Sequence, residues 1–584
     1  GATCTFIGQK GTSTSINIEI EAAGLYELIV RYVQPYDKTK KVQYLNVNDT
    51  NQGEVSFPYT LEWKEMSSGI VKLNEGNNNI EFESYWGYTF FDYVIVKPAD
   101  ESITNLSVDK TLVNPNSTEE TKSLISYLAD VYGKNILSGQ QELCGAHNYE
   151  GSEAEFTYIQ ENTGELPAVR GFDFMNYRGN DLVWDDYCAE RVIEWYDEKG
   201  GIPTVCWHWF SPGDIGKSGD SSFYTENTSF SISKALTSGT KENIALLNDI
   251  DFMAEKFKQV QAAGVPVLFR PLHEAEGAWF WWGAEGPEPC VELYRLIYDK
   301  FTNEHGLNNI IWVWTSYDYE TSPQWYPGDD VVDIIGYDKY NAKDGLPNGS
   351  AISSTFYNLV KFNNGTKMVA MSENDTIPQV SSLIDEMAGW LYFCPWYGWW
   401  LTSEQNNPVD WLIEIYQSDY CITLDELPNL KTYSTSDFTS TPTSTNSTET
   451  TSATTTPTLT PSPTDDKTTS PTTVTIEPTI TGDDTDEDYT INYSSDNWSN
   501  GATVTVEIIN NTSVDKIGWS LNWTFPSNQQ ITNLWSGKYT QDGSDITVTN
   551  EEWNDTILAN SSISFGFNMS FAGENIEPTD FNIE

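Results

Sequence analysis

The sequence predicts a multidomain protein in which a central (β/α)8 TIM barrel is flanked by two all-β sandwich modules. Apolar strand-like runs alternate with helical stretches in the centre, short alternating strands fill both ends, and a Thr/Ser/Pro-rich segment precedes the last part. At 584 residues the chain is too long for one ordinary domain. We predict a sandwich at residues 1–100, the barrel at 101–434, an extended linker at 435–486 and a second sandwich at 487–584.

The composition favours a protein that handles neutral polysaccharide. The chain contains 22 Trp, 32 Tyr and 25 Phe at a mean hydropathy of -0.45, and exposed aromatic rings fit the flat apolar faces of sugars. Its formal net charge of -54 disfavours nucleic acid and anionic membranes as partners. No apolar run is long enough for a transmembrane helix, and none of the seven Cys forms a CxxC pair, so no metal site is expected.

No signal peptide is visible. The expectation of a secreted, extracellular protein therefore rests on the linker and the aromatic content alone. We expect a monomer.

Residues 1–100 carry the pattern of a β-sandwich, with strands expected at Ser15–Ile20, Tyr26–Tyr32, Asn79–Glu83 and Phe91–Val96. The stretches AGLYELIVRY and WGYTFFDYVIVKP resemble a carbohydrate-binding module of family 35. This resemblance implies that Trp86 and Tyr88 contact a sugar, although core aromatics at a sheet end are the alternative. The family's Glu-rich first strand, which carries calcium ligands, is not apparent, so we expect a module truncated at its N-terminus in which calcium remains possible but open.

The central region reads as eight strands of a barrel. They are expected at Asn135–Gln140, Ala168–Asp173, Thr204–His208, Val267–Glu274, Ile310–Trp314, Val332–Asp338, Met368–Glu373 and Tyr397–Leu401. Helices are expected at Lys241–Ala262 and Glu288–Asn303. Nearly every strand ends in a polar or aromatic residue, which is typical of the catalytic face of this fold.

The stretch Leu268–Gly283 indicates an active site, because a buried strand there releases Arg270, His273 and Glu274 beside a run of aromatic residues. An ion-paired core segment is the alternative. Hydrolysis of a glycosidic bond needs two carboxyl groups on either side of the scissile linkage. Glu274 at the end of strand four and Glu373 at the end of strand seven fit that need.

The nearby acids Glu276, Glu285 and Glu288 are expected to be solvated.

The central motifs resemble glycoside hydrolase family 26, the endo-β-1,4-mannanases. The resemblance rests on ILSGQ, WHWFSP, FRPLHEAEGAWFWWG, WYPGDDVVDIIGYD and SEN, which span the central domain. It implies a retaining enzyme without a catalytic cofactor, with Glu274 as general acid/base and Glu373 as nucleophile.

The same resemblance implies further substrate contacts. His208 and His273 would bind the sugar at the cleavage subsite, although a core histidine is the alternative for His208. Tyr337 would support the nucleophile. The residues that would line nearby subsites are Trp279, Trp400, Trp282 and Trp314. Asp173 and Asp338 read equally well as sugar contacts or as ion-pair partners of Arg170 and Lys339.

The last 98 residues carry DNWSNGATVTV, IGWSLNWTF, NLWSGKYTQDG and EEWNDTI, which together resemble a cellulose-binding module of family 2. The resemblance implies a flat cellulose-binding face made by Trp498, Trp535 and Trp553. Trp519 and Trp523 would instead alternate into the core of the sandwich.

The combined prediction is a secreted endo-β-1,4-mannanase that hydrolyses mannan, glucomannan or galactomannan and is held on plant cell wall by its modules. A mixed-linkage β-glucanase or a β-1,3-xylanase of the same family is the first alternative. A non-catalytic wall-binding protein is the second.

Overall fold

The computed structural model describes residues 5–434 except 8–10, 37, 144–152, 179–184 and 341–345, and residues 489–583 except 499–500, 515, 536, 551–554, 558, 560, 572–574 and 579–580. The linker predicted at 435–486 lies outside the described residues. The chain forms two compact units, Gly1–Asn446 and Ser447–Glu584. No helix in the described ranges combines the length and apolar character needed to cross a bilayer.

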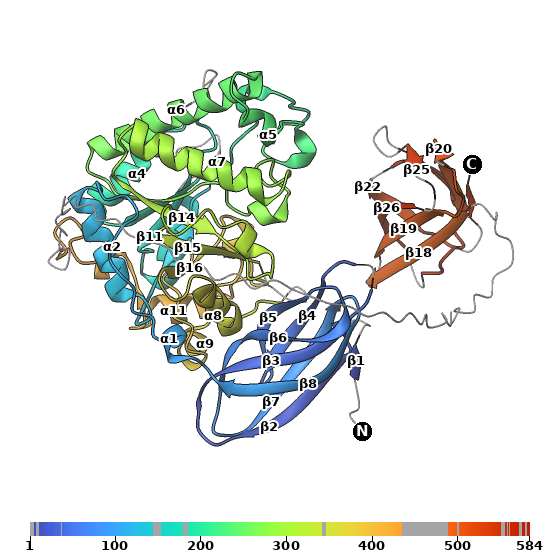
Figure 1. The fold of residues 1–584 in the computed structure, drawn as a ribbon, viewed down its shortest axis with the longest axis horizontal. Helices are drawn as coiled ribbons and strands as arrows, with labels where there is room; N and C mark the ends of the chain where they lie inside the picture. Colours follow the sequence, from blue (N-terminus) through green and yellow to red (C-terminus); the bar gives the residue numbers. More distant parts are fainter. Residues whose placement is uncertain are drawn as a thin grey trace, which may run out of the picture. The chain divides into compact units, whose positions relative to one another are not determined.

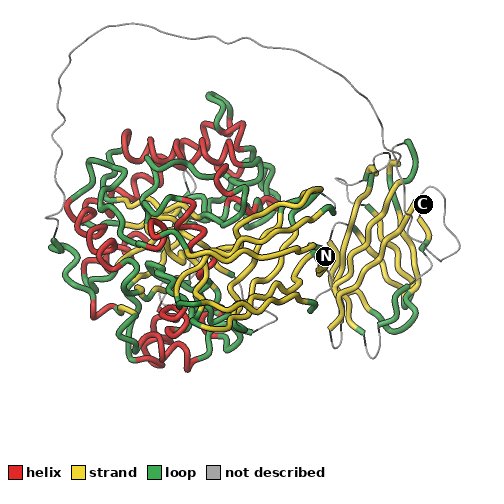
Figure 2. The backbone as a smooth tube through the Cα atoms, turned by 60° about the horizontal axis from the view of Figure 1, so that its bottom comes forward, coloured by secondary structure: helices red, strands yellow, loops and turns green. Residues whose placement is uncertain are grey.

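A parallel sheet of seven strands in chain order forms the wall of the barrel. Its strands are β10 (Gly139–Gln141), β11 (Val169–Asp173), β12 (Ile202–Cys206), β13 (Val267–Arg270), β14 (Ile310–Thr315), β15 (Ile334–Lys339) and β16 (Met368–Asn374). Helices cover the sheet on the outside (Figures 1 and 2). Nearly every residue of these strands is buried, as expected for a barrel whose interior is filled by side chains. The predicted barrel is confirmed.

The α-helices of this unit surround the sheet or cap its ends. They are α1 (Glu101–Thr104), α2 (Glu119–Val131), α3 (Ala154–Thr163), α4 (Cys188–Asp197), α5 (Ile232–Ala235), α6 (Lys241–Ala262), α7 (Pro287–Asp299), α8 (Ser353–Phe362), α9 (Val380–Asp385), α10 (Trp399–Thr402) and α11 (Val409–Tyr416). Helix α6 has the predicted bounds, and the Thr240 side chain caps it by accepting a hydrogen bond from the Asn243 N–H. Helix α7 runs on into a π-helical turn, η5 (Lys300–Glu304).

Residues 391–396 close the barrel between its first and last strands. The Leu391 N–H donates to Val369 O of β16, and the Leu137 N–H of β9 (Ile136–Leu137) donates to Leu391 O, both at 2.9 Å. Strand β9 also pairs with β17 (Cys421–Ile422). The eighth strand predicted at Tyr397–Leu401 is therefore wrong: helix α10 begins there, after Gly398 at φ +63°. A short aromatic run does not distinguish a strand from a helix.

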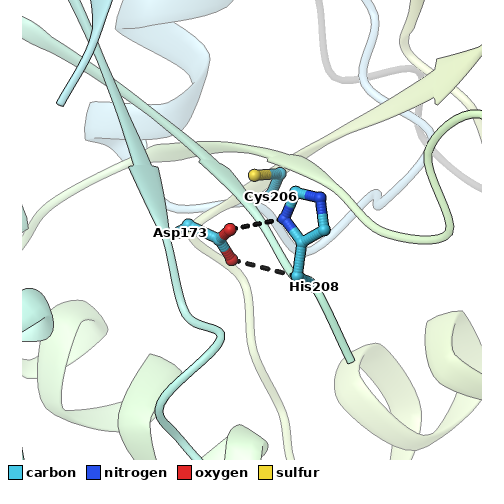
Figure 3. Close-up of side chains that lie close together, drawn as sticks. All are labelled: Asp173, Cys206 and His208. Atoms are coloured by element: carbon cyan, nitrogen blue, oxygen red, sulfur yellow. Dashed lines mark hydrogen bonds and ion pairs between the residues drawn. The ribbon is translucent and has the colours of Figure 1, made fainter. Parts of the chain in front are cut away.

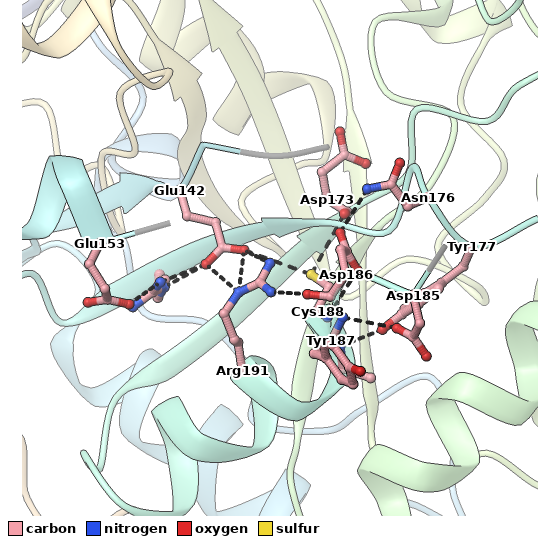
Figure 4. Close-up of polar contacts among 12 residues, drawn as sticks. Glu142, Glu153, Asp173, Asn176, Tyr177, Asp185, Asp186, Tyr187, Cys188 and Arg191 are labelled. Atoms are coloured by element: carbon pink, nitrogen blue, oxygen red, sulfur yellow. Dashed lines mark hydrogen bonds and ion pairs between the residues drawn. The ribbon is translucent and has the colours of Figure 1, made fainter. Parts of the chain in front are cut away.

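A buried ionic cluster ties strand β11 to helix α4 (Figure 4). Glu142, which follows β10, accepts hydrogen bonds from Arg170 at 2.7 Å and from Arg191 at 2.5 Å. Its side chain has no exposed surface, and the two guanidinium groups are less than one tenth exposed. Arg170 also pairs with Glu153 at 2.7 Å.

The N-terminal module is a sandwich of two antiparallel four-stranded sheets. One contains β1 (Thr5–Ile7), β8 (Thr89–Pro98), β3 (Gly24–Gln34) and β6 (Thr60–Leu73). The other contains β2 (Ser13–Ile20), β7 (Gly76–Trp86), β4 (Lys41–Val47) and β5 (Thr50–Phe57). Inward residues such as Leu28, Leu45 and Phe57 form its fully buried core.

The C-terminal unit is a second sandwich. One sheet contains β18 (Tyr489–Trp498), β19 (Gly501–Asn510), β26 (Ser562–Ser570) and β22 (Gln530–Trp535); the other contains β23 (Lys538–Asp542), β24 (Asp545–Thr549), β21 (Ser520–Thr524) and β27 (Asn582–Ile583). A short pair, β20 (Lys516–Ile517) and β25 (Thr556–Ile557), completes it. Trp519 and Trp523 are each 3% exposed and belong to the core, as predicted.

Candidate active site

The expected nucleophile, Glu373, lies near the end of β16 and is held by two donors. Arg270, the last residue of β13, donates to Oε2 at 2.7 Å, and the Tyr340 hydroxyl donates to Oε1 at 2.6 Å. Both carboxylate oxygens therefore have a fixed partner, which orients the group. Glu373 is 5% exposed, so its position is set by the barrel rather than by solvent.

Arg270 is itself locked by a second carboxylate. Its other terminal nitrogen donates to Asp338 Oδ2 at 2.6 Å, and Ser372 Oγ donates to Asp338 Oδ1 at 2.8 Å. The register of β15 and β16 shifts between Tyr337 and Asp338, which sets Asp338 opposite Glu373. The partner of Asp338 is thus Arg270 and not Lys339, whose amino group donates to a backbone carbonyl.

The hydroxyl expected on the nucleophile comes from Tyr340 and not from Tyr337. Successive residues of a strand point to opposite faces, so Asp338 and Tyr340 share the side that faces Glu373. The Tyr337 ring instead stacks on Trp390 at a centroid distance of 6.0 Å. Tyr337 still lines the outer cleft, but the prediction that it supports Glu373 is wrong.

Glu274, the expected acid/base, lies four residues beyond the end of β13 in a strained turn. Its φ of +55° is in the left-handed region, which costs a non-glycine residue about 1–2 kcal/mol. Trp279 Nε1 donates to its Oε2 at 2.9 Å. Burial, then the nearby charges of Glu373 and Asp338, raise the pKa of Glu274 well above its usual range. A raised pKa favours the protonated carboxyl group, which is the form that a general acid requires.

Two histidines lie together beside these carboxyl groups. His208 Nε2 and His273 Nε2 are 3.3 Å apart, and His208 Nδ1 is 2.5 Å from Asp173 Oδ2 (Figure 3). Asp173 Oδ1 also accepts the His208 backbone N–H at 3.0 Å, so both oxygens of Asp173 orient one histidine. Burial and the neighbouring His208 and Arg270 lower the pKa of His273 well below its usual range, which favours a neutral ring.

Asp173, Cys206 and His208 are close enough to be considered as metal ligands. Both Asp173 oxygens are already engaged by His208, so the geometry favours positioning of the imidazole ring over ligation.

The aromatic residues named from sequence separate into exposed and buried groups. Trp279 is 42% exposed and lines the cleft, and the half-buried Trp400 packs edge-on against Tyr340 at 5.1 Å. Trp282 and Trp314 are fully buried. The prediction that these two bind substrate is therefore corrected: Trp282 donates to His273 O and supports the site from behind.

A cavity of about 560 Å³ opens beside Glu274 and Trp279. Glu276 lines it and accepts hydrogen bonds from the Tyr317 N–H at 3.1 Å and from Ser322 Oγ at 2.8 Å. Glu276 was expected to be solvated, yet it is half-buried and burial raises its pKa.

Arg270, Tyr340 and Glu276 were not given a role from sequence. In the sequence, Arg270 stands out because it is a charged residue at the end of an apolar strand. Tyr340 lies two residues after Asp338, and this spacing places both side chains on the same face of a strand.

The structure describes most, but not all, of the sugar-contact residues predicted in the two modules. Trp86 and Tyr88 are 50% and 44% exposed, so both are available to a ligand. Trp498 and Trp535 end strands β18 and β22 of the same sheet. Trp553 lies outside the described residues.

A parallel barrel that presents two carboxyl side chains at the C-terminal ends of strands four and seven, within an aromatic cleft, defines a glycoside hydrolase. Comparison with known families agrees. The model of glycosyl hydrolase family 26 matches residues 113–426, the carbohydrate binding module (family 35) matches 2–99, and the cellulose binding domain matches 488–584. The chain belongs to glycosyl hydrolase family 26.

Individual relatives extend over most of the chain. A mannan endo-1,4-beta-mannosidase of Thermothelomyces thermophilus is 37% identical over 72% of this chain and 84% of its own length. Mannan endo-1,4-beta-mannosidase B of Piromyces sp is 33% identical over 72% of this chain and 71% of its own.

Two solved structures share both fold and sequence with the chain. A ruminal GH26 endo-beta-1,4-mannanase superposes with a TM-score of 0.60 at 41% identity, covering 72% of this chain and 92% of that one. The Podospora anserina GH26-CBM35 beta-(1,4)-mannanase superposes with a TM-score of 0.53 at 34% identity, covering 74% of this chain and 97% of that one.

Proposed function

We propose that this protein is an endo-β-1,4-mannanase that cleaves internal linkages of mannan, glucomannan or galactomannan with retention of anomeric configuration. The observation that carries the proposal is the pairing of Glu274, whose pKa is raised by burial and by Glu373, with a Glu373 carboxylate held by Arg270 and Tyr340. The relatives are named for mannan cleavage, which supports mannan as the substrate here.

In the first step the Glu373 carboxylate attacks the anomeric carbon while Glu274 gives its proton to the leaving oxygen. The glycosidic bond breaks, and a glycosyl ester forms on Glu373. In the second step Glu274, now ionised, takes a proton from water as the water oxygen attacks the anomeric carbon. The ester bond breaks, the carboxylate of Glu373 is restored, and Glu274 regains its proton.

The surrounding residues orient the reacting groups. Arg270 and Tyr340 hold the nucleophile, and His208 and His273 offer ring nitrogens as hydrogen-bonding groups to the sugar at the cleavage point. Trp279 presents its ring to the cleft and fixes Glu274 through its indole N–H. None of these steps uses a cofactor.

The flanking modules would hold the enzyme on plant cell wall and thereby raise the local substrate concentration. We propose that the C-terminal unit binds cellulose. We further propose that the protein acts outside the cell as a monomer. Metal analysis of the purified protein tests calcium binding by the N-terminal module. The family matches of residues 2–99 and 488–584 support polysaccharide binding.

Product analysis on galactomannan, barley mixed-linkage glucan and β-1,3-xylan tests the substrate. We expect manno-oligosaccharides of mixed length from galactomannan and little release from the other two polymers. Preferential release from barley glucan or β-1,3-xylan would replace mannan by the corresponding alternative. Absence of release from all three would favour a non-catalytic wall-binding protein.

Substitution of Trp535 by Ala tests the C-terminal module separately. We expect binding to crystalline cellulose to fall about tenfold, because loss of one stacked aromatic removes about 1–3 kcal/mol. Hydrolysis of soluble mannan should stay unchanged. Undiminished retention on cellulose would exclude Trp535 from the binding face.

A further inference from the structure

The N-terminal module is docked on the barrel through β5, β6 and α8. Gly69 of β6, at φ +122°, lies so close to α8 that an added Cβ would be 2.5 Å from the Ser354 Cβ. Ser354 Oγ donates to the Gln52 carbonyl at 2.9 Å, and Ser353 Oγ donates to Gln52 Oε1 at 3.0 Å. Ile70 is buried in the same apolar cluster as the barrel core. This contact is a packed interface and not a tethered arrangement.

Charged side chains reinforce the interface. Lys361 of α8 and Lys97 of β8 each lie 2.7 Å from a different oxygen of Glu27 in β3. Burial alone would raise the pKa of Glu27, but the hydrogen bonds from these two lysines lower it to about 2. Asn348 Nδ2 also donates to Asn51 Oδ1 at 3.2 Å. The module is therefore held in one orientation on the barrel.

The docked module forms part of the wall of the cleft. The cavity of about 560 Å³ beside Glu274 and Trp279 is lined on its other side by Lys40 and Glu54 of the module. A second cavity, of about 480 Å³, lies between module and barrel. The two cavities share four lining residues, Glu54, Tyr317, Asp318 and Tyr319. The hollow that begins at Glu274 thus continues along the junction.

The junction offers the groups that sugars need. The Tyr317 and Tyr319 rings are stacked at 5.3 Å, and the Lys40 amino group lies 3.3 Å from the centroid of Tyr319. Burial raises the pKa of Glu54, and the charge of Asp318 raises it further. Carboxyl groups withdrawn from water beside an aromatic face suit the donating hydroxyls of a pyranose, and binding sites often occur at domain interfaces.

We infer that Lys40 and Glu54 of the N-terminal module bind hydroxyl groups of a sugar unit distant from the bond that is cut. The substrate is the same β-linked polysaccharide chain that passes Glu274, so the inference rests on the proposed function. Lys40 donates to a hydroxyl oxygen, and Glu54 accepts from a neighbouring hydroxyl. The module then acts as part of the catalytic cleft, and long chains gain contacts that short chains do not reach.

The test compares kcat/KM for mannotriose and for mannohexaose in the full chain and in Glu54→Gln and Lys40→Ala variants. We expect each variant to lose about tenfold on mannohexaose and less than twofold on mannotriose, because a hydrogen bond to a charged group is removed only for the long substrate. Glu75→Gln is the matched control, since Glu75 is an exposed acid of the same module that lines neither cavity. Thermal unfolding of every variant checks that the module stays folded.

Equal losses on both substrates, or no loss on either, would overturn the inference while leaving the proposed function intact. If the unaltered protein cleaves glucan or xylan oligosaccharides instead of mannan, the proposed function fails, and the same length comparison is made on those substrates. Lack of cleavage of any oligosaccharide would overturn both.

Discussion

At the scale of single residues, the support of the nucleophile depends on one tyrosine hydroxyl. Tyr340→Phe removes the 2.6 Å hydrogen bond to Glu373 and should lower kcat about 10- to 100-fold, because one oriented donor at a charged reacting group contributes about that much. Tyr337→Phe is the matched control and should change kcat less than twofold. Steady-state kinetics on soluble mannan measures both. A larger loss in the Tyr337 variant would contradict the assignment.

The raised pKa of Glu274 makes a second residue-scale prediction. Catalysis needs the protonated form, so activity should persist up to this raised pKa and fall as the pH rises through it. Glu373→Gln removes the negative charge that disfavours ionisation of Glu274. We expect the pKa of Glu274 to drop by about two units in that variant, since unit charges about 5 Å apart interact by about 3 kcal/mol at an effective dielectric near 20.

Titration of a 13C-labelled Glu274 carboxyl group in the two proteins measures the shift. An unchanged pKa of Glu274 in the Glu373→Gln variant would mean that the charge of Glu373 does not contribute to the raised pKa.

Sequence reasoning located the carboxyl pair but not the residues that hold it. Glu274 and Glu373 follow apolar strand runs, and that pattern is visible without a structure. Tyr337 and Tyr340 are chemically identical, and only the shift in register between β15 and β16 decides which of them faces Glu373. The burial of Trp282 and Trp314 likewise depends on packing between segments that are distant in the chain.

At the scale of elements, the link between β11 and α4 depends on a buried ion cluster around Glu142. Glu142→Gln leaves two buried guanidinium groups short of a counter-charge, and breaking a buried pair costs about 3–5 kcal/mol. We expect the free energy of unfolding of the barrel to fall by about that amount in urea denaturation. Glu119→Gln is the control: this acid is 76% exposed in its pair with Lys122, and the change should stay within about 0.5 kcal/mol.

A loss in the Glu142 variant no larger than in this control would contradict a structural role for the cluster.

Most barrel strands were predictable because parallel strands buried on both faces read as apolar runs. The exception was the segment that closes the barrel. Residues 391–396 pair through the main chain with strands on both sides, whereas the aromatic run that follows, Tyr397–Leu401, enters a short helix. The local composition of these two segments does not show which one pairs with the barrel strands and which one forms a helix.

At the scale of the whole molecule, the first two predicted domains form one compact unit, and a glycine permits their close contact. Gly69→Ala would place a methyl group against the backbone of Ser354 in addition to its strained φ. Gly76→Ala is the matched control, because its φ is also positive but an added Cβ meets open space. We expect the control to cost about 1 kcal/mol and Gly69→Ala about 2–3 kcal/mol more, from strain and overpacking.

Thermal unfolding of both variants measures the difference. Equal destabilisation would show that docking does not require the close approach.

The central claim is that Glu274 and Glu373 cut β-1,4-mannan by double displacement. The most direct test is proton NMR of the anomeric signals during the first minutes of hydrolysis of a β-1,4-manno-oligosaccharide. Retention predicts that the β-anomer appears first and that the α-anomer grows later by mutarotation. Initial appearance of the α-anomer would contradict a glycosyl ester on Glu373 and would require a single displacement by water.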